Sequence, residues 1–394
     1  MTREKKAVKL CPILDAEALT AHAATFLPNP RIDRERPYGA RERAILSVAE
    51  GRRAWATIAA WPGYAPTPLR ALPSIAREAR VTEILYKDEG HRFSLKSFKA
   101  LGGAYAVERL AREHGGANLT VTCATDGNHG RAVAWGARRV GAKAVIYVHE
   151  TVSPGRAAAI ASFGAKVVRA GRTYDEAVRI SAEAARANGW HIVSDTSWPG
   201  YEDVPRQVMQ GYAVLAAEAL EQGARPTHVF VQGGVGGLAA GVLSWLWETQ
   251  GARRPVLAVV EPDRAACLLA SARTGEATAV GGDLETLMAG LACGEPSRLA
   301  WALLRDGADA FMAITDEAAV ATMRDLAALR IVGGESGVAA LAGFRGAARD
   351  PAIRAALRLD ASSRILCFGT EGATDPEVYQ KLVGRTPEEV LEGA

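Results

Sequence analysis

The sequence predicts an α/β protein with two open, mainly parallel, twisted-sheet domains that carry helices on both faces. Short apolar runs alternate with alanine-rich stretches of helical periodicity along most of the chain. Strands joined by helices of ten or more residues pair in parallel, because parallel strands need a crossover connection. At 394 residues, the chain exceeds what one hydrophobic core usually serves, so we expect two domains.

Eight segments have the apolar composition of strands. They span residues 82–89, 118–125, 143–150, 165–171, 191–195, 227–232, 255–262 and 363–370. Helical spacing of apolar positions marks residues 157–164, 174–189 and 207–223. Each of these three stretches ends on a glycine, which commonly terminates a helix in the left-handed conformation.

Composition and charge exclude several classes of function. The chain is 48% hydrophobic and 23% charged, with a formal net charge of +3, which is the balance of an ordinary globular protein. Its basic residues are dispersed, so nucleic acid is not an expected partner. The five cysteines form no CxxC and no Cys/His cluster, so no metal is expected. Cys267 and Cys293 could pair only if the fold brings them together.

One apolar run, residues 229–247 (VFVQGGVGGLAAGVLSWLW), is nearly long enough to span a bilayer. Gln232 and the glycines that follow it interrupt the first third of the run. A strand, a tight turn and a buried helix explain this pattern better. The N-terminal MTREKKAVKLCPILDAE lacks the apolar region of a secretory signal. We therefore expect no membrane segment and a cytoplasmic location.

Ligands of parallel sheets bind outside the carboxyl ends of the strands, and four loops follow predicted strands. The first is RFSLKSFKALGG, residues 92–103, with Lys96 and Lys99. A lysine at a helix N-terminus inside a pocket has its ammonium form disfavoured by burial and by the helix dipole, which makes the amine nucleophilic. The alternative is a pair of solvated charges on an ordinary helix.

The second loop is ATDGNHG, residues 124–130, whose backbone N–H groups and small polar side chains suit a substrate carboxylate. The alternative is a helix cap in a tight turn. The fourth loop, CFGTEGATDP at residues 367–376, could offer a hydroxyl to a heterocycle nitrogen, or be an exposed acidic turn.

The third loop is QGGVGGLAAG, residues 232–241, where glycines let the backbone approach a phosphate at a helix N-terminus. It has a rival interpretation. Gly234, Gly236 and Ala239 also satisfy the dinucleotide pattern G-x-G-x-x-A, and Glu261 ends the next strand. This pattern would indicate an NAD-dependent oxidoreductase, but a dehydrogenase gives no reason for the first two loops.

Together, SFK at residues 97–99, then DGNHG, then GGVGG resemble the pyridoxal-phosphate enzymes of the tryptophan synthase β-subunit type, or fold type II. A closer resemblance covers residues 60 to 376. Its segments are GYAPTPLRALP, KDEGHRFSLKSFKALGG, TDGNHGR, DTSWPGYE, MAGLACGEP, GGESG and TEGATDP, which in this order resemble the diaminopropionate ammonia-lyases. DTSWPGYE and MAGLACGEP single out this branch among its relatives.

The resemblance implies that pyridoxal 5′-phosphate lies in the cleft between the domains, bound covalently by Lys99. Asn128 would contact its 3′ oxygen and Thr370 its ring nitrogen. The phosphate would lie against Gly233, Gly234, Val235, Gly236 and Gly237. The implied substrate site consists of Thr125, Gly127 and His129 around the carboxylate, with Asp126 and Asp195 near the amino groups. Lys99, Asp126 and Asp195 would be catalytic, and Asp126 would be the base for one substrate enantiomer.

The implied reaction is the α,β-elimination of 2,3-diaminopropionate to pyruvate and two ammonia, by a homodimer. A serine or threonine dehydratase is the alternative. We place the large domain at residues 10–97 and 191–394 and the small domain at 98–190. Two departures from the family stand out, since Lys96 replaces a small neutral residue and Gly369 replaces a serine. Lys96 would repel a cationic substrate, so we expect it to point away from the site.

Overall fold

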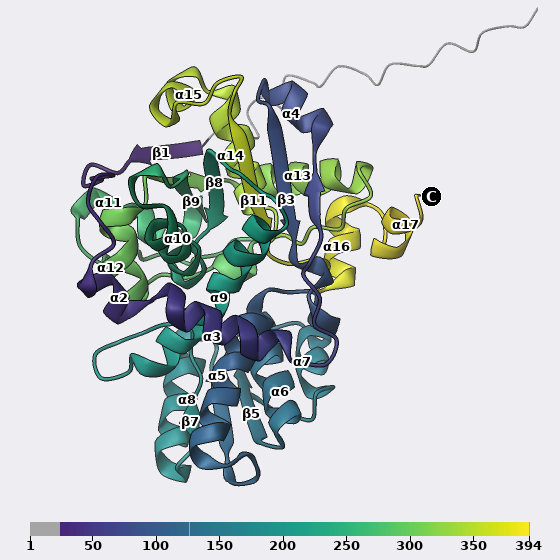
Figure 1. Cartoon of the computed structure of the whole chain (residues 1–394). Helices are drawn as coiled ribbons and strands as arrows, with labels where there is room; N and C mark the ends of the chain where they lie inside the picture. Colours follow the sequence, from purple (N-terminus) through teal and green to yellow (C-terminus); the bar gives the residue numbers. More distant parts are fainter. Residues whose placement is uncertain (1–23, 126, 394) are drawn as a thin grey trace, which may run out of the picture.

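A computed structural model describes residues 24–125 and 127–393, which form two lobes, each built around its own sheet (Figure 1). The strands are β1 Ala24–Pro28, β2 Leu69–Ala71, β3 Glu83–Asp88, β4 Thr120–Ala124, β5 Lys143–Val148, β6 Lys166–Arg169, β7 His191–Ile192, β8 His228–Gln232, β9 Val256–Pro262, β10 Ala310–Ile314 and β11 Arg364–Gly369. All eight strands expected from the sequence are present. Three were missed, namely β1, β2 and β10.

The helices are α2 Ala40–Ile45, α3 Val48–Ala59, α4 Pro73–Ala79, α5 Lys99–His114, α6 Asn128–Val140, α7 Pro154–Ala161, α8 Tyr174–Asn188, α9 Asp203–Glu221, α10 Gly237–Gln250, α11 Cys267–Thr274, α12 Arg298–Gly307, α13 Asp316–Ala328, α14 Ala339–Arg349, α15 Pro351–Leu357, α16 Pro376–Val383 and α17 Pro387–Glu392. The three expected helical stretches correspond to α7, α8 and α9. The observed α7 begins earlier, at Pro154, because Ser153 caps it by accepting from the Arg156 N–H.

The larger sheet has the strand order β1-β10-β9-β8-β11-β3-β2. Its five inner strands are parallel, and only the edge strands β1 and β2 pair antiparallel to their neighbours. Alternate residues of β8 belong to different cores: Val229 and Val231 face the core with α10, whereas Phe230 stacks edge-on against Phe344 of α14. Helices therefore cover both faces, and the expected α/β class is confirmed.

The smaller sheet has the order β6-β5-β4-β7, with all pairs parallel. Helices α6 and α8 both contact β4 and β5, and α5 packs on α6. The strand β7, His191–Ile192, pairs with β4 in this sheet. The expected division puts residue 191 in the large domain, whereas the two residues of β7 pair within the smaller sheet.

Helix α9 joins the two lobes, because it packs on α5 of the smaller lobe and on α10 of the larger one. The approach of α5 and α9 is so close that only glycine fits. A Cβ on Gly211 would lie 2.0 Å from the carbonyl oxygen of Leu101, and one on Gly102 would lie 2.4 Å from the Tyr212 ring. In Figure 1, α3 runs along this same junction.

The apolar run at residues 229–247 is a strand, a turn and a buried helix, as expected, with β8 completely buried and α10 following it. Within residues 24–125 and 127–393, no helix is long and apolar enough to cross a membrane.

Replacing Gly211 by alanine should separate α5 from α9, since a Cβ cannot occupy a point 2.0 Å from a backbone oxygen. We expect a loss of more than about 2 kcal/mol in the free energy of unfolding, measured in urea. The matched control is Gly155→Ala in α7, where the nearest atom to a new Cβ is 4.0 Å away. That variant should not lose stability, and could gain up to about 1 kcal/mol from the helix propensity of alanine. Equal effects would contradict the close packing described here.

Candidate active site

Residues from both lobes line one cavity, and most of the predicted site residues lie there. They are Lys99, Thr125, Gly127, Asn128, His129, Asp195, Gly234, Val235, Gly236, Gly237 and Thr370. Asp126 lies outside the described residues. Gly233 is not brought to the cavity, because its N–H donates to the Val260 carbonyl at 2.8 Å and its Cα faces Leu268 and Val259.

Lys99 begins α5, and its Nζ donates to Asp195 Oδ2 at 2.6 Å. Burial alone would lower the pKa of Lys99, but the Asp195 carboxylate raises it above its ordinary value. Our expectation of a destabilised ammonium is therefore wrong for this state of the site. Burial also opposes the charge of Asp195, yet Lys99 holds the pKa of that carboxyl well below its usual range.

The segment DTSWPGYE holds Asp195 in place. Tyr201 stacks on Trp198 with ring centroids 4.2 Å apart. The Tyr201 hydroxyl donates to the Ile192 carbonyl at 2.8 Å and accepts from the Ser194 N–H at 3.0 Å. Tyr201 thus fixes Ser194, the residue directly before Asp195, to the end of β7. This contact gives the aromatic residues of the segment a role in positioning Asp195.

The segment before Lys99 is held against the loop after β11. Phe98 donates its N–H to the Thr370 carbonyl at 3.0 Å, and Gly372 donates to the Lys96 carbonyl at 3.0 Å. Lys96 itself has a left-handed backbone, with φ of 53°. Its side chain is exposed and does not line the cavity, as expected.

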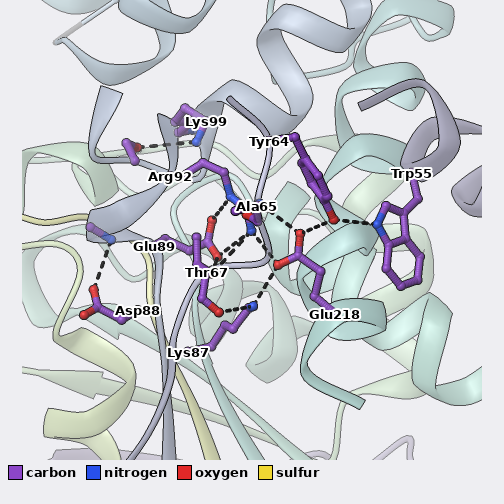
Figure 2. Close-up of polar contacts among 12 residues, drawn as sticks. Trp55, Tyr64, Ala65, Thr67, Lys87, Asp88, Glu89, Arg92, Lys99 and Glu218 are labelled. Carbon is purple, nitrogen blue, oxygen red and sulfur yellow. Dashed lines mark hydrogen bonds and ion pairs between the residues drawn. The ribbon is translucent and has the colours of Figure 1, made fainter. Parts of the chain in front are cut away.

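A buried ion cluster fixes the start of this segment (Figure 2). Glu218 of α9 lies 2.7 Å from Lys87 Nζ of β3 and accepts from both terminal nitrogens of Arg92, at 2.7 and 2.9 Å. Arg92 also donates to both oxygens of Glu89, at 2.8 and 2.9 Å. All four side chains are at most 1% exposed. Burial would raise the pKa of Glu218, but Arg92 and Lys87 together lower it.

Neutral groups complete the cluster. Thr67 donates its hydroxyl to Glu89 at 2.5 Å, and its carbonyl accepts from Lys87 at 2.8 Å. Tyr64 donates to Glu218 at 2.9 Å and accepts from the Trp55 indole at 2.6 Å. Because every charge has partners in fixed directions, the chain from β3 to α5 has little freedom.

The loop ATDGNHG ends at the N-terminus of α6. Thr125 Oγ1 accepts from the N–H groups of Gly127 and Gly130, at 3.0 and 3.1 Å, and so closes the turn. The Nε2 of His129 contacts the Val193 carbonyl at 2.7 Å. Burial lowers the pKa of His129, so its Nδ1 is a bare acceptor 3.9 Å from Asp195. Asn128 donates to Glu371.

The glycine-rich loop between β8 and α10 forms a cradle of backbone N–H groups. The N–H groups of residues 234–237, in the turn before α10 and at its first residue, donate to no backbone carbonyl in the described part of the chain. Gly236 has φ of 94°, and a Cβ on Gly234 would lie 3.2 Å from Cys293 Sγ. Glycine at these two positions permits the left-handed turn and the close packing around it.

The dinucleotide interpretation fails on Glu261. Its two oxygens accept from the N–H groups of Leu268 and Leu269, both at 2.7 Å, at the start of α11. Burial raises the pKa of Glu261 to about 8. This carboxyl is buried as a cap for the following helix and does not line the cavity, so it cannot accept from a ribose hydroxyl there.

Thr370, the expected hydroxyl partner of a heterocycle, lines the cavity. Gln232 donates its side-chain amide to Thr370 Oγ1 at 2.8 Å, so the hydroxyl hydrogen of Thr370 is free to donate elsewhere. Gly369 cannot be a serine in this fold, because a Cβ there would lie 2.0 Å from the Tyr86 ring. The ring of Tyr86 therefore requires a glycine at position 369.

Sequence reasoning missed several cavity residues, namely Arg156, Tyr212, Gln232, Glu335 and Glu371. Three of them adjoin segments that were singled out: Gln232 precedes the glycines, and the two glutamates lie within GGESG and TEGATDP. Arg156 and Tyr212 carry no local signal, because they reach the cavity from α7 and α9.

Cys267 and Cys293 both border the glycine loop. Cys267 donates its thiol to the Gly234 carbonyl at 3.5 Å, and Cys293 lies beside the same glycine. The two residues are thiols in this structure and do not form a disulfide.

The comparisons with known proteins agree with this site. The family model described as pyridoxal-phosphate dependent enzyme matches residues 60–370. The diaminopropionate ammonia-lyase of Escherichia coli (strain K12) is 41% identical over 82% of this chain and 88% of its own. The chain belongs to the diaminopropionate ammonia-lyase family of pyridoxal-phosphate-dependent enzymes.

Solved structures of that family have the same fold. The selenomethionine holo form of the Escherichia coli diaminopropionate ammonia-lyase superposes with a TM-score of 0.84, at 36% identity over 91% of this chain and 96% of its own. The same enzyme in complex with D-serine gives the same values. The expected fold type II architecture is therefore confirmed.

The residues present fit pyridoxal 5′-phosphate. The N–H cradle at residues 234–237 lies at a helix N-terminus and suits the phosphate. The cavity also holds the Lys99 amine, the Thr370 hydroxyl and the Asn128 amide, which suit an aldehyde, a ring nitrogen and a phenolic oxygen.

Replacing Lys99 by alanine should abolish the visible absorption band of the cofactor-loaded protein, since the covalent bond to the chain is lost. The control Lys96→Ala should retain the band, because Lys96 is exposed outside the cavity. An absorption spectrum of each purified variant decides the point. A band that survives in Lys99→Ala would contradict the assignment.

Replacing Glu218 by glutamine should destabilise the protein by about 3–5 kcal/mol, because Lys87 and Arg92 would lose a shared buried counter-charge. Urea unfolding measures the change. Glu50→Gln removes an exposed partner of Arg53 and should cost less than about 1 kcal/mol. A small effect of both variants would show that the buried cluster does not hold the fold.

Proposed function

We propose that this protein catalyses the α,β-elimination of 2,3-diaminopropionate, giving pyruvate and two ammonia with the uptake of one water. The observation that carries the proposal is the contact of Lys99 with Asp195 in a cavity built from two helix N-termini, in a member of this enzyme family. When bound, pyridoxal phosphate acts as an electron sink that acidifies the Cα proton of an amino acid.

The chain's own residues bind the substrate carboxylate. The N-terminus of α6 lies at the loop of residues 125–129, where a helix dipole and N–H groups favour an anion. Thr125 and Gly127 frame the turn, and the neutral His129 adds no opposing charge. The substrate is thereby oriented with its Cα towards Lys99.

Lys99 is the proposed base at Cα, and Asp195 positions it. The Asp195 carboxylate lies 2.6 Å from Lys99 Nζ and fixes the direction of that side chain, which acts as a base at Cα in its neutral amine form. Asp126 is proposed as the base on the other face, which would allow both enantiomers to react. The Thr370 hydroxyl, neutral and oriented by Gln232, would leave the ring nitrogen of the cofactor unprotonated.

Three further assignments belong to this proposal. The substrate is a small amino acid, the enzyme is cytoplasmic, and the working form is a homodimer. The chain divides into a large domain that holds the glycine-rich loop and a small domain that holds the loop of residues 125–129.

Pyruvate release from 2,3-diaminopropionate should exceed release from serine, and 2-oxobutyrate release from threonine should be smaller still. A higher rate on serine or threonine would replace the proposal with a hydroxy amino acid dehydratase. The assay needs only the cofactor-loaded wild-type protein.

Replacing Asp195 by asparagine should lower kcat for 2,3-diaminopropionate by about 10²- to 10⁴-fold, since the charged partner that orients the Lys99 base is lost. Pyruvate release measures this, and the visible absorption band shows whether the cofactor is still bound. The control Asp203→Asn lies on the exposed first turn of α9, with its side chain 89% exposed, and should leave kcat unchanged. Full activity in Asp195→Asn would remove this residue from the mechanism.

A further inference from the structure

Glu371 is a buried carboxylate on the cavity wall that takes no part in the steps above. It follows β11 and is 5% exposed. Its backbone pairs with that of Ser97 in an isolated antiparallel bridge. Its carbonyl oxygen accepts from the Gly334 N–H at 2.9 Å, and a Cβ on Gly337 would lie 2.5 Å from the same oxygen. The position of Glu371 is therefore fixed by the segment before Lys99 and by the loop GGESG.

The side chain of Glu371 is held at both oxygens. Its Oε1 accepts from the Ser336 N–H at 3.0 Å. Its Oε2 accepts from Nδ2 of Asn128, the first residue of α6, so the contact joins the larger lobe to a helix N-terminus of the smaller one. Within residues 24–125 and 127–393, the Asn128 side chain forms no other hydrogen bond. The direction of the Asn128 amide is thus set by Glu371.

The arrangement around Glu371 is that of a carboxylate anion. Both of its oxygens receive N–H donors, whereas a carboxylic acid would need an acceptor for its own hydrogen. Burial raises the pKa of Glu371, and the guanidinium of Arg156 opposes that rise. The neighbouring Glu335 has one oxygen, Oε2, without a donor in the described part of the chain. A proton shared by the two glutamates therefore resides on Glu335, and Glu371 stays ionised.

An ionised Glu371 decides which end of the Asn128 amide faces it. A carboxylate only accepts hydrogen bonds, so the amide must present Nδ2, because Oδ1 in that place would set two oxygens against each other. Nδ2 carries two hydrogens, and Glu371 takes one of them. Asn128 lines the same cavity as Lys99, so the second hydrogen is left for an acceptor that enters this cavity.

We propose that Glu371 is a positioning residue for the cofactor, whose carboxylate holds Asn128 so that Nδ2 donates to the phenolic 3′ oxygen of pyridoxal phosphate. The inference rests on the contact expected between Asn128 and that oxygen, which belongs to the cofactor site of the proposed function. It is independent of which amino acid reacts. Glu371 itself contacts neither the cofactor nor the substrate and acts through Asn128.

The hydrogen bond from Asn128 keeps the phenolic oxygen ionised, because a donor stabilises the charged form of its acceptor. Pyridoxal phosphate bound to a lysine absorbs visible light when this oxygen is ionised, and near-ultraviolet light when the oxygen carries the proton. The ratio of the visible to the near-ultraviolet band therefore reports whether a donor faces the oxygen. This ratio is measured before any amino acid is added and needs no activity.

The first test is the absorption spectrum of the cofactor-loaded Glu371→Gln variant. The glutamine oxygen can still accept from the Ser336 N–H, and its Nε2 then faces Nδ2 of Asn128. Two donors repel each other, so the Asn128 amide turns over and presents Oδ1 to the cofactor. We expect the band ratio to fall at least about fivefold, as for the loss of one hydrogen bond. An unchanged ratio overturns the inference.

A double-mutant cycle shows whether Glu371 acts through Asn128. Asn128→Ala removes the amide and should lower the band ratio by itself. In that background, Glu371→Gln should lower the ratio no further, and equal reductions in both backgrounds would overturn the inference. If Asn128→Ala leaves the ratio at its wild-type value, the expected cofactor contact of Asn128 fails together with the inference. A lack of pyruvate release from 2,3-diaminopropionate contradicts only the proposed reaction, since these spectra contain no substrate.

The matched control is Asp375→Asn. Asp375 is a second carboxylate near Arg156, at 3.7 Å, but it does not line the cavity. Asparagine can still cap α16 by accepting from the Val378 N–H. The band ratio should stay within about twofold of wild type. A fall as large as that in Glu371→Gln would overturn the inference, because loss of charge beside Arg156 would then suffice.

A charge-conserving swap covers the case in which Glu371→Gln does not fold. The double variant Asn128→Asp with Glu371→Gln keeps one negative charge and one hydrogen bond between the two positions, with the direction of the bond reversed. Urea unfolding should show a stability close to that of wild type. The band ratio should remain at least about fivefold below wild type, because an acceptor now faces the phenolic oxygen. A wild-type ratio in the swapped pair would show that position 371 is merely structural and overturn the inference.

Discussion

The active site depends on a buried cluster of four charges that joins β3 and the segment after it to α9. Lys87 and Arg92 meet Glu218 and Glu89 at contacts of 2.7 to 2.9 Å, with almost no solvent exposure. Such a cluster contributes little net stability when complete, but leaving one charge unpaired is expensive. The cluster therefore acts as a constraint. If β3, α9 or the segment before Lys99 were displaced, the charges on the other two would be buried without a partner.

The cavity is lined by loops that follow strands of both sheets. Lys99, the loop of residues 125–129 and Asp195 come from the ends of β3, β4 and β7, while the glycine cradle and Thr370 follow β8 and β11. Contacts across the gap tie the lobes together: Ser153 to Asp375, Arg156 to Glu335 and Asn128 to Glu371. Four of these side chains, those of Asn128, Arg156, Glu335 and Glu371, thus line the cavity and also hold the lobes together.

Much of this arrangement could be predicted from the sequence. Parallel strands with crossover helices leave a clear pattern, and their carboxyl-end loops must gather at one edge. Three strands were missed. β2 has only three residues, and β1 lies at the edge of the sheet. The residues of β10, AFMAI, have an apolar composition that also suits a helix. Local patterns also gave no warning that the Gly233 N–H is used within the sheet.

Other features could not be predicted, since they depend on partners distant in the chain. The pKa of Lys99 is raised because the fold brings Asp195, 96 residues later in the chain, to 2.6 Å from its Nζ. Position 369 has no room for a side chain because Tyr86 fills that space. Glu335 resembles any loop glutamate until the fold buries it beside Glu371.

The buried cluster around Arg92 also has a consequence for warm conditions. Hydration of ions becomes less favourable on heating, so the penalty for burying these four charges decreases as temperature rises. Hydrophobic stabilisation per unit area levels off over the same range. The anchor of the segment that carries Lys99 should thus weaken less on heating than the apolar packing around it, so Lys99 should keep its position until late in thermal unfolding.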